Sequence, residues 1–388
     1  MLDRPYAFLS VISQNIGKGG ESFEVKSLFD CTHLAGLLMK NRFIRSATRD
    51  GLADDYGRMT DELLNTYEDL AKGGVGTIIT GHAYVTDIEK SKMPFQMGIY
   101  DDSFIDDYIE LTDLVHKYNA NIILQLNCVG SQTLAGNADK LIWGPSSVRD
   151  MASQIKPKEM EIDEILFLQD AFADAALRAK KAGFDGVQIH AAHGYILSKF
   201  LSPLYNRRPD DYGGAIENRA RMLLETYSAI RRKVGSEYLV LIKLNCEDYM
   251  QQGFTFEECR YVCQQLAELG VDAIEISGGN SSSIYNLGPI RKIAPGHAPY
   301  FLTHAANIAL EVNVPIILVG GNRDISSLTN ILNSTPISYF SLSRPLICEN
   351  DLVNRWQSGN LVHAKCTSCC KCVGLEKTVC ILNVPKRQ

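Results

Sequence analysis

Short apolar runs alternate regularly with amphipathic segments between residues 40 and 346, and this pattern is compatible with few folds. The runs are rich in β-branched residues, whereas the intervening segments space their apolar residues three to four apart, as helices do. Eight such runs are present, at residues 43–48, 76–81, 121–127, 186–192, 238–245, 273–279, 315–321 and 339–345. Eight strands that alternate with helices predict an α/β fold, a single closed (β/α)8 TIM barrel.

The domain organisation follows from the same pattern. Helical spacing is clearest at residues 63–72 and 166–181 and in the segment after Glu217, and no Pro/Gly/Ser-rich linker divides the chain. The pattern predicts an N-terminal extension at 1–25, one barrel at 26–360 and a short Cys-rich tail at 361–388. Left-handed helix caps are expected at Gly73, Gly183, Gly235 and Gly270.

Composition narrows the class of partner. The chain has 388 residues, enough for a barrel of about 250 residues with insertions. Its net charge of −6, without a basic block, argues against nucleic acid or an anionic membrane surface. It has no apolar run of the ~20 residues that a membrane span needs and no signal-peptide pattern at its start. We therefore expect a cytoplasmic protein that binds a small molecule, and a homo-oligomer is compatible with the sequence.

Polar or glycine residues follow nearly every predicted strand at its C-terminal end. Active sites of these barrels lie at that rim, and the long loop predicted at 130–150 belongs to the same end. The rim residues are Thr48, Gly81, His82, Gln125, His190, His193, Lys243, Ser277, Gly278, Gly279, Gly320, Gly321, Ser343 and Arg344.

Two parts of this rim indicate an anionic ligand. Gly320 and Gly321 let backbone NH groups approach a phosphate, and Arg344 supplies a cation, although glycines also simply end strands. Lys243 interrupts an apolar strand, so its ammonium group should face an anionic or electron-rich group unless it reaches solvent. Neither a GxGxxG fingerprint after a strand nor a P-loop is present.

The segment 190–195 combines His190, His193 and Tyr195 just past the fourth strand. Two histidines three residues apart are compatible with half of a zinc site or with an ordinary hydrogen-bonded pair. Together with the tyrosine, they also suit a clamp on a carbonyl group beside a weak acid that donates a proton.

These motifs, taken together, resemble the Old Yellow Enzyme family of FMN-dependent ene-reductases from about Lys26 to Trp356. The barrel is nearest in character to the FMN-binding part of 2,4-dienoyl-CoA reductase and 2-enoate reductase. The resemblance rests on residues 40–48, 74–81, 125–127, 144–147, 190–203, 206–208, 211–214, 217–219 and 343–345.

The resemblance implies an FMN site across the top of the barrel. Ser46, Ala47 and Thr48 would lie beside the ring, Gln125 at its pyrimidine edge and Lys243 near N1 and O2. The phosphate would bind to Gly320, Gly321, Ser343 and Arg344. Further cofactor contacts are expected from Gly81, His190 and Gly279.

The activity implied is transfer of hydride from NAD(P)H, through the flavin, to an electron-poor C=C bond of the enone or enoate class. His190 and His193 would bind the activating group, and Tyr195 would protonate the α carbon. A demethylase or dehydrogenase that passes electrons to an iron–sulfur cluster or a partner is the alternative, and a non-enzymatic sensor is a third. Cys128 replaces a histidine usual in the family, and Arg49 and Asp50 extend the first strand with polar residues.

The tail is a separate question because five of the eleven cysteines fall between Cys366 and Cys380. It resembles the cluster-binding segment of larger relatives, with Cys366, Cys369, Cys372 and Cys380 as implied ligands. A [4Fe-4S] cluster, a zinc knot and free thiols all remain open from the sequence.

Overall fold

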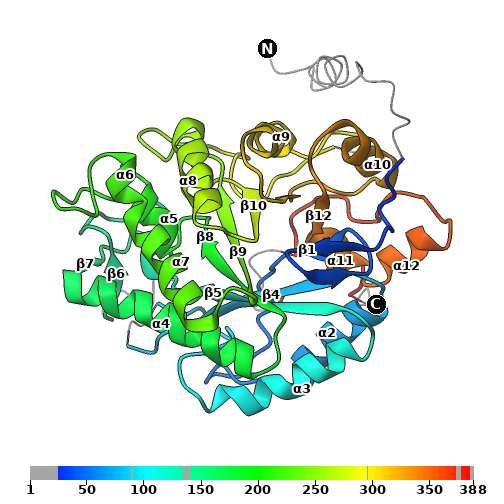
Figure 1. Cartoon of the computed structure of the whole chain (residues 1–388), viewed down its shortest axis with the longest axis horizontal. Helices are drawn as coiled ribbons and strands as arrows, with labels where there is room; N and C mark the ends of the chain where they lie inside the picture. The colour runs from blue at the N-terminus through cyan, green and yellow to red at the C-terminus, as the bar shows by residue number, and fades with distance from the viewer. Residues whose placement is uncertain (1–24, 89–90, 134–139, 295, 373–376, 385–388) are drawn as a thin grey trace.

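The computed structural model describes residues 25–88, 91–133, 140–294, 296–372 and 377–384, and it contains the predicted barrel (Figure 1). Eight parallel strands close in the order β3, β4, β5, β8, β9, β10, β11, β12. Their bounds are Phe43–Arg45, Thr77–Tyr84, Asn121–Asn127, Gly186–Ala191, Leu239–Asn245, Ala273–Ser277, Ile316–Leu318 and Tyr339–Leu342. Each lies in or overlaps one predicted run, so the fold class is confirmed. Most predicted runs extend past the strand, because the rim residues have left the hydrogen-bonded ladder.

Helices surround the barrel (Figure 1). The three segments predicted as helices correspond to α2, α4 and α7. The longer helices are α2 (Asp61–Lys72), α3 (Phe104–His116), α4 (Ile162–Lys181), α7 (Arg221–Val234), α8 (Phe256–Glu268), α9 (Leu302–Glu311) and α10 (Ile325–Ser334). The shorter ones are η1 (Gly130–Gln132), α5 (Ile196–Leu201), α6 (Ile216–Arg219), α11 (Arg344–Cys348) and α12 (Leu352–Gln357).

One predicted glycine cap is wrong. Gly183, Gly235 and Gly270 adopt the positive φ angles of 85°, 84° and 83° that favour glycine, although Gly235 has a ψ of 175° and so is extended, whereas Gly73 has a φ of −69°. The left-handed residue there is Gly74, with a φ of 92°. Gly73 is needed for another reason: a Cβ atom on it would lie 1.8 Å from the Asn350 carbonyl oxygen.

An antiparallel hairpin that the sequence did not indicate precedes the barrel. It consists of β1 (Thr32–Leu34) and β2 (Leu37–Met39). Leu34 and Met39 are fully buried against inward-facing residues from the first half of the barrel strands, such as Ile123 and Leu241. The hairpin therefore closes the N-terminal end of the barrel, and the cavity is left at the other end.

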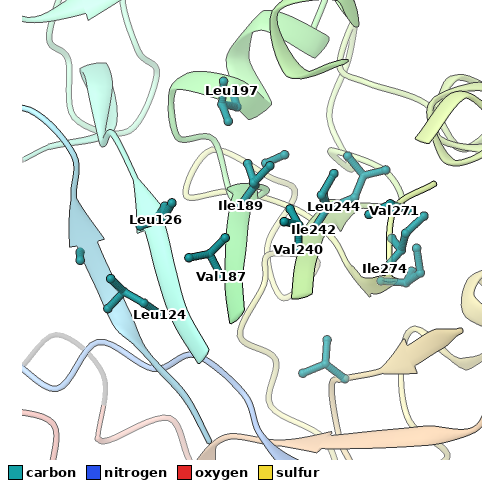
Figure 2. Packing of buried hydrophobic residues seen from close by; sticks show 14 of the residues in the cluster. Leu124, Leu126, Val187, Ile189, Leu197, Val240, Ile242, Leu244, Val271 and Ile274 are labelled. Atoms are coloured by element: carbon teal, nitrogen blue, oxygen red, sulfur yellow. The ribbon is translucent and has the colours of Figure 1, made fainter. Parts of the chain in front are cut away.

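The strands alternate between two environments, and this alternation positions the site. Val187 and Ile189 of β8 belong to the hydrophobic layer beneath the helices, as do the even-numbered residues of β9 (Figure 2). Side chains of a strand point to opposite faces in turn, so Gln188, His190 and Lys243 point into the barrel. The outer face of these strands is apolar, and the polar side chains that can take part in chemistry lie on the inner face, beyond its apolar first half.

The tail crosses the C-terminal end of the barrel. Thr378 donates from its backbone N to the Asp50 carbonyl oxygen at 2.9 Å and from Oγ1 to the Arg49 carbonyl oxygen at 2.6 Å. The amide of Asn383 donates to the Cys348 carbonyl oxygen at 3.1 Å. The predicted extension at 1–25 lies, except for Val25, outside the described residues. Among the described helices, none has the length and apolar character that crossing a membrane requires.

A histidine on α3 makes one part of the stability depend on pH. His116 Nε2 lies 2.9 Å from Asp185 Oδ2, and this hydrogen bond raises the pKa of His116 above 6.5. A raised folded-state pKa means that the stabilisation is fully present below pH 6.5 and is lost as the pH rises through that higher pKa. Because the His116 side chain is 38% exposed, we expect less than about 1 kcal/mol.

Urea unfolding as a function of pH checks this expectation for His116→Gln. The difference in unfolding free energy from the unaltered protein should shrink above neutral pH. A His116→Gln effect that grows with pH would contradict the assignment.

Candidate active site

A cavity of about 300 Å³ opens at the C-terminal ends of the barrel strands, within the size range of small-molecule sites. It gathers side chains that lie far apart in the sequence, as expected for the rim of a parallel barrel. The predicted site residues that line it are Ser46, Ala47, Thr48, Gln125, His190, His193, Tyr195, Lys243, Gly320, Gly321, Ser343 and Arg344.

Two predicted cofactor residues do not line this cavity. A Cβ atom on Gly81 would lie 2.9 Å from Asp50 Oδ2, so Gly81 allows the segment after β3 to pack closely against β4. Gly279 adopts a φ of 74°, and a Cβ atom there would lie 2.5 Å from the Leu287 carbonyl oxygen. Both glycines shape the walls behind the cavity.

A chain of buried polar groups forms the floor of the cavity. Gln125 Nε2 donates to Gln188 Oε1 at 2.7 Å, and Gln188 Nε2 donates to Glu275 Oε2 at 2.8 Å. Lys243 Nζ lies 3.2 Å from the same Glu275 oxygen and donates to Ser46 Oγ at 2.9 Å. The anionic group expected opposite Lys243 is therefore Glu275, which is fully buried and which we did not recognise in the sequence.

This chain leaves one acceptor unused. Gln125 Oε1 is buried and has no hydrogen-bond partner among the described residues. A buried amide oxygen without a partner is costly, so a bound donor is expected there. The pyrimidine edge of a flavin offers such an N–H donor, and this part of the cavity fits the ring of FMN.

The opposite end of the cavity fits a phosphate. Gly320 and Gly321 adopt φ angles of 95° and 92°, and a Cβ atom on Gly320 would lie 2.5 Å from Tyr300 Cε2. Only glycine suits both positions, and their bare backbone lets an anion approach closely. Arg344 lies at the same end, but its Nη1 donates to Cys370 Sγ at 3.1 Å.

The two histidines and the tyrosine form one aromatic cluster on the cavity wall. The His190 ring centroid lies 5.0 Å from that of His193 and 4.8 Å from that of Tyr195. Burial lowers the pKa of both histidines well below 6.5, so both imidazoles are neutral near neutral pH. Burial also raises the pKa of Tyr195 to about 12, so its phenol keeps its proton.

Hydrogen bonds fix the orientation of the two imidazoles. His190 Nδ1 accepts the backbone N–H of Ala192 at 3.2 Å, which leaves the ring proton on Nε2. His193 Nε2 lies 2.7 Å from Ser277 Oγ. Among the described residues, no group of three or more His, Cys, Asp or Glu side chains is placed to hold a metal ion, so the zinc alternative for the segment 190–195 gains no support.

The cavity also contains residues that the sequence did not single out. His82 was predicted only as one of many rim residues, and it lines the cavity. Arg49 lines the cavity, whereas Asp50 faces away and pairs with Arg45 at 3.7 Å. Cys128, which stands where the family usually has a histidine, is buried in the hydrophobic core and does not line the cavity. It therefore makes no direct contact with a molecule bound there. Other such lining residues are Gln132, Tyr300, Phe301, Asn322, Arg323 and Ser341.

The cysteine tail borders the phosphate end. Cys366 and Cys372 line the main cavity, and these two together with Cys369, Cys370 and Cys380 surround a small neighbouring pocket. Among the described tail residues, no group of three or more His, Cys, Asp or Glu side chains is placed to hold a metal ion. In this conformation the four predicted ligands do not form the set that a [4Fe-4S] cluster or zinc requires.

Comparison with known proteins places the chain in a family. A profile of the NADH:flavin oxidoreductase / NADH oxidase family matches residues 27–361. An NADH oxidase of Thermoanaerobacter brockii is 32% identical over 351 residues, which are 90% of this chain and 54% of that protein. An NADPH dehydrogenase of Geobacillus thermodenitrificans is 35% identical over 301 residues, which cover 76% of this chain and 82% of the relative.

A solved structure supports the same conclusion. The complex of 2-naphthoyl-CoA reductase with 2-naphthoyl-CoA superposes with a TM-score of 0.79 at 26% identity, over 87% of this chain and 53% of that one. The chain thus spans about half the length of this protein and of the Thermoanaerobacter NADH oxidase. The barrel, the rim motifs and the family profile agree, and the chain belongs to the NADH:flavin oxidoreductase / NADH oxidase family, as its resemblance to Old Yellow Enzyme indicated.

Proposed function

We propose that this protein is an FMN-dependent ene-reductase that uses NAD(P)H to reduce a C=C bond conjugated to an electron-withdrawing group. The observation that carries the proposal is the cluster of two neutral histidines and a protonated tyrosine on the wall of a cavity whose floor fits a flavin. Bound FMN would supply the hydride chemistry that links the nicotinamide to the β carbon of the substrate.

The protein's own groups would hold the cofactor at both ends. Gln125 offers its unused Oε1 to the pyrimidine edge, and Lys243 adds a cation nearby that its partner Glu275 partly offsets. Backbone NH groups at Gly320 and Gly321 would bind the phosphate. Ser343 and Arg344 line the same end, where Arg344 would exchange its thiol contact for the phosphate.

The histidines activate the substrate as hydrogen-bond donors. His190 presents Nε2–H because its Nδ1 is already used by Ala192. Two neutral donors on a carbonyl oxygen withdraw charge from the conjugated C=C bond and stabilise the enolate that hydride addition creates. The relative whose complex contains 2-naphthoyl-CoA supports an activating carbonyl group in the substrate.

Tyr195 would complete the reduction by protonating the α carbon. Its phenol stays protonated near neutral pH, as a general acid must before transfer, and it lies against His190 on the same wall. A demethylase would oxidise its substrate, so it would need an acceptor for the electrons of the reduced flavin and not a proton donor. Reduction of a C=C bond by NAD(P)H through the flavin needs no electron transfer through the tail cysteines, which among the described residues are not grouped as a metal site.

A spectroscopic experiment tests the proposal in one preparation. The protein purified under nitrogen, or reconstituted with FMN, should show two flavin absorption bands that bleach with NADH or NADPH. Adding an enone such as 2-cyclohexenone should restore them. A protein that cannot be reconstituted with FMN would overturn the cofactor assignment, and bleached bands that only oxygen restores would overturn the reductase assignment.

A further inference from the structure

The imidazole of His82 lies beside the proposed proton donor. His82 lies near the C-terminal end of β4, and Tyr195 immediately precedes α5. The two residues are far apart in the sequence, so only the fold brings them together. His82 Nε2 lies 3.5 Å from the Tyr195 phenol oxygen, and the ring centroids are 5.3 Å apart. His82 is 7% exposed and lines the cavity.

Two amides on the far side of His82 fix its proton on Nε2. Gln96 Oε1 accepts the Met93 backbone N–H at 2.8 Å, so its NH₂ group faces His82 Nδ1 at 2.9 Å. The Asn127 amide nitrogen lies 3.4 Å from the same ring nitrogen. A nitrogen that accepts these N–H groups carries no proton of its own, and the proton is therefore on the nitrogen that faces Tyr195.

The charge state of His82 makes it a donor of a hydrogen bond and not a source of protons. Burial, with a smaller contribution from the Arg49 cation, lowers the pKa of His82 to about 3. The other titratable rings that face it are Tyr195 and His190, and both are uncharged near neutral pH. Because a neutral imidazole is a far weaker acid than a phenol, the proton delivered to carbon comes from Tyr195.

We propose that His82 is a positioning residue for Tyr195: its Nε2–H donates to the phenol oxygen, so the Tyr195 O–H points toward the substrate. The inference rests on the proposed role of Tyr195 as proton donor. In the transfer, the O–H bond of Tyr195 breaks and a C–H bond forms at the α carbon. The electron pair of the O–H bond stays on the phenol oxygen, where the hydrogen bond from His82 stabilises the phenolate until water reprotonates it.

A pair of substitutions at this position tests the inference in the FMN-loaded protein. His82→Leu removes the donor and should slow the oxidative half-reaction, measured by stopped flow with 2-cyclohexenone, by roughly tenfold. His82→Gln is the matched control, because its amide retains an N–H donor and should recover most of the rate. The rate at which NADH reduces the flavin reports general damage to the cavity. The oxidative rate of each variant is therefore compared with its own rate of flavin reduction.

The same measurement in a Tyr195→Phe background separates positioning from a merely structural role. Without the phenol, His82→Leu should have little further effect on the oxidative half-reaction. An equal slowing in both backgrounds would show that His82 acts on the shape of the cavity, and the inference would be wrong. If Tyr195→Phe alone does not change the oxidative half-reaction, the proposed role of Tyr195 as proton donor is wrong, and with it the positioning role of His82.

A variant outside the cavity covers the case in which His82→Leu does not fold. Gln96→Leu keeps the imidazole but removes the nearer of the two donors that hold Nδ1 unprotonated, and leaves only the longer Asn127 contact. The ring can then carry its proton on Nδ1, and the oxidative half-reaction should slow severalfold. A Gln96→Leu protein with an unaltered oxidative half-reaction would count against the inference.

Discussion

Tyr195→Phe should slow the oxidative half-reaction by about 10²–10⁴-fold, the usual contribution of a positioned general acid. Phenylalanine keeps the ring that packs against His190 but removes the proton that the α carbon needs. No proton is delivered to carbon while NAD(P)H reduces the flavin, so the reductive half-reaction should keep most of its rate. Stopped-flow absorbance of the flavin bands measures the two half-reactions separately.

Tyr205→Phe is the matched control for this variant. Tyr205 lies shortly after α5, is buried, and hydrogen-bonds Ser282 Oγ at 3.3 Å without lining the main cavity. The substitution Tyr205→Phe should leave the rates of both half-reactions nearly unaltered. Because the pKa of Tyr195 is about 12, the oxidative rate of the unaltered protein should also be independent of pH through the neutral range. An oxidative rate that Tyr195→Phe does not change would exclude the tyrosine as proton donor.

The barrel was predictable because its strands carry a strong local signal. An apolar run such as that of β9 (Leu239–Asn245) is buried on both faces, and the polar residues near its end mark the rim. The hairpin of β1 and β2 gave no such signal. Its strands have three residues each, and their stability comes from the closed end of the barrel that Leu34 and Met39 fill.

The site was predictable where strand ends supply it and not where loops do. Parallel strands all end at one rim, so His190 and Lys243 could be placed together from the sequence. Glu275 was missed because a single carboxylate in an apolar strand gives no indication of its partner. Gln96 lies in a loop, and its contact with His82 depends on the path of that loop. Local patterns do not encode such long-range contacts.

Lys243→Met should lower the free energy of unfolding by about 3 kcal/mol, toward the lower end of the ~3–5 kcal/mol typical of a broken buried ion pair. The substitution leaves the fully buried Glu275 carboxylate without its cation. Ser46 and Gln188 still donate to that carboxylate, which keeps the expected loss near the lower end. Urea unfolding of the FMN-free protein measures the loss.

A second substitution separates the folding role of Lys243 from its cofactor role. Lys243→Met combined with Glu275→Gln buries no charge and should recover most of the lost stability, yet FMN affinity, measured by fluorescence titration, should stay weakened because the cation is absent. Lys233→Met breaks the half-exposed pair with Asp174 and should cost less than about 1 kcal/mol. If the double variant were as unstable as Lys243→Met, lost packing would explain the effect. If it bound FMN normally, the cation at Lys243 would have no part in holding the flavin, and Gln125 with the phosphate end would suffice.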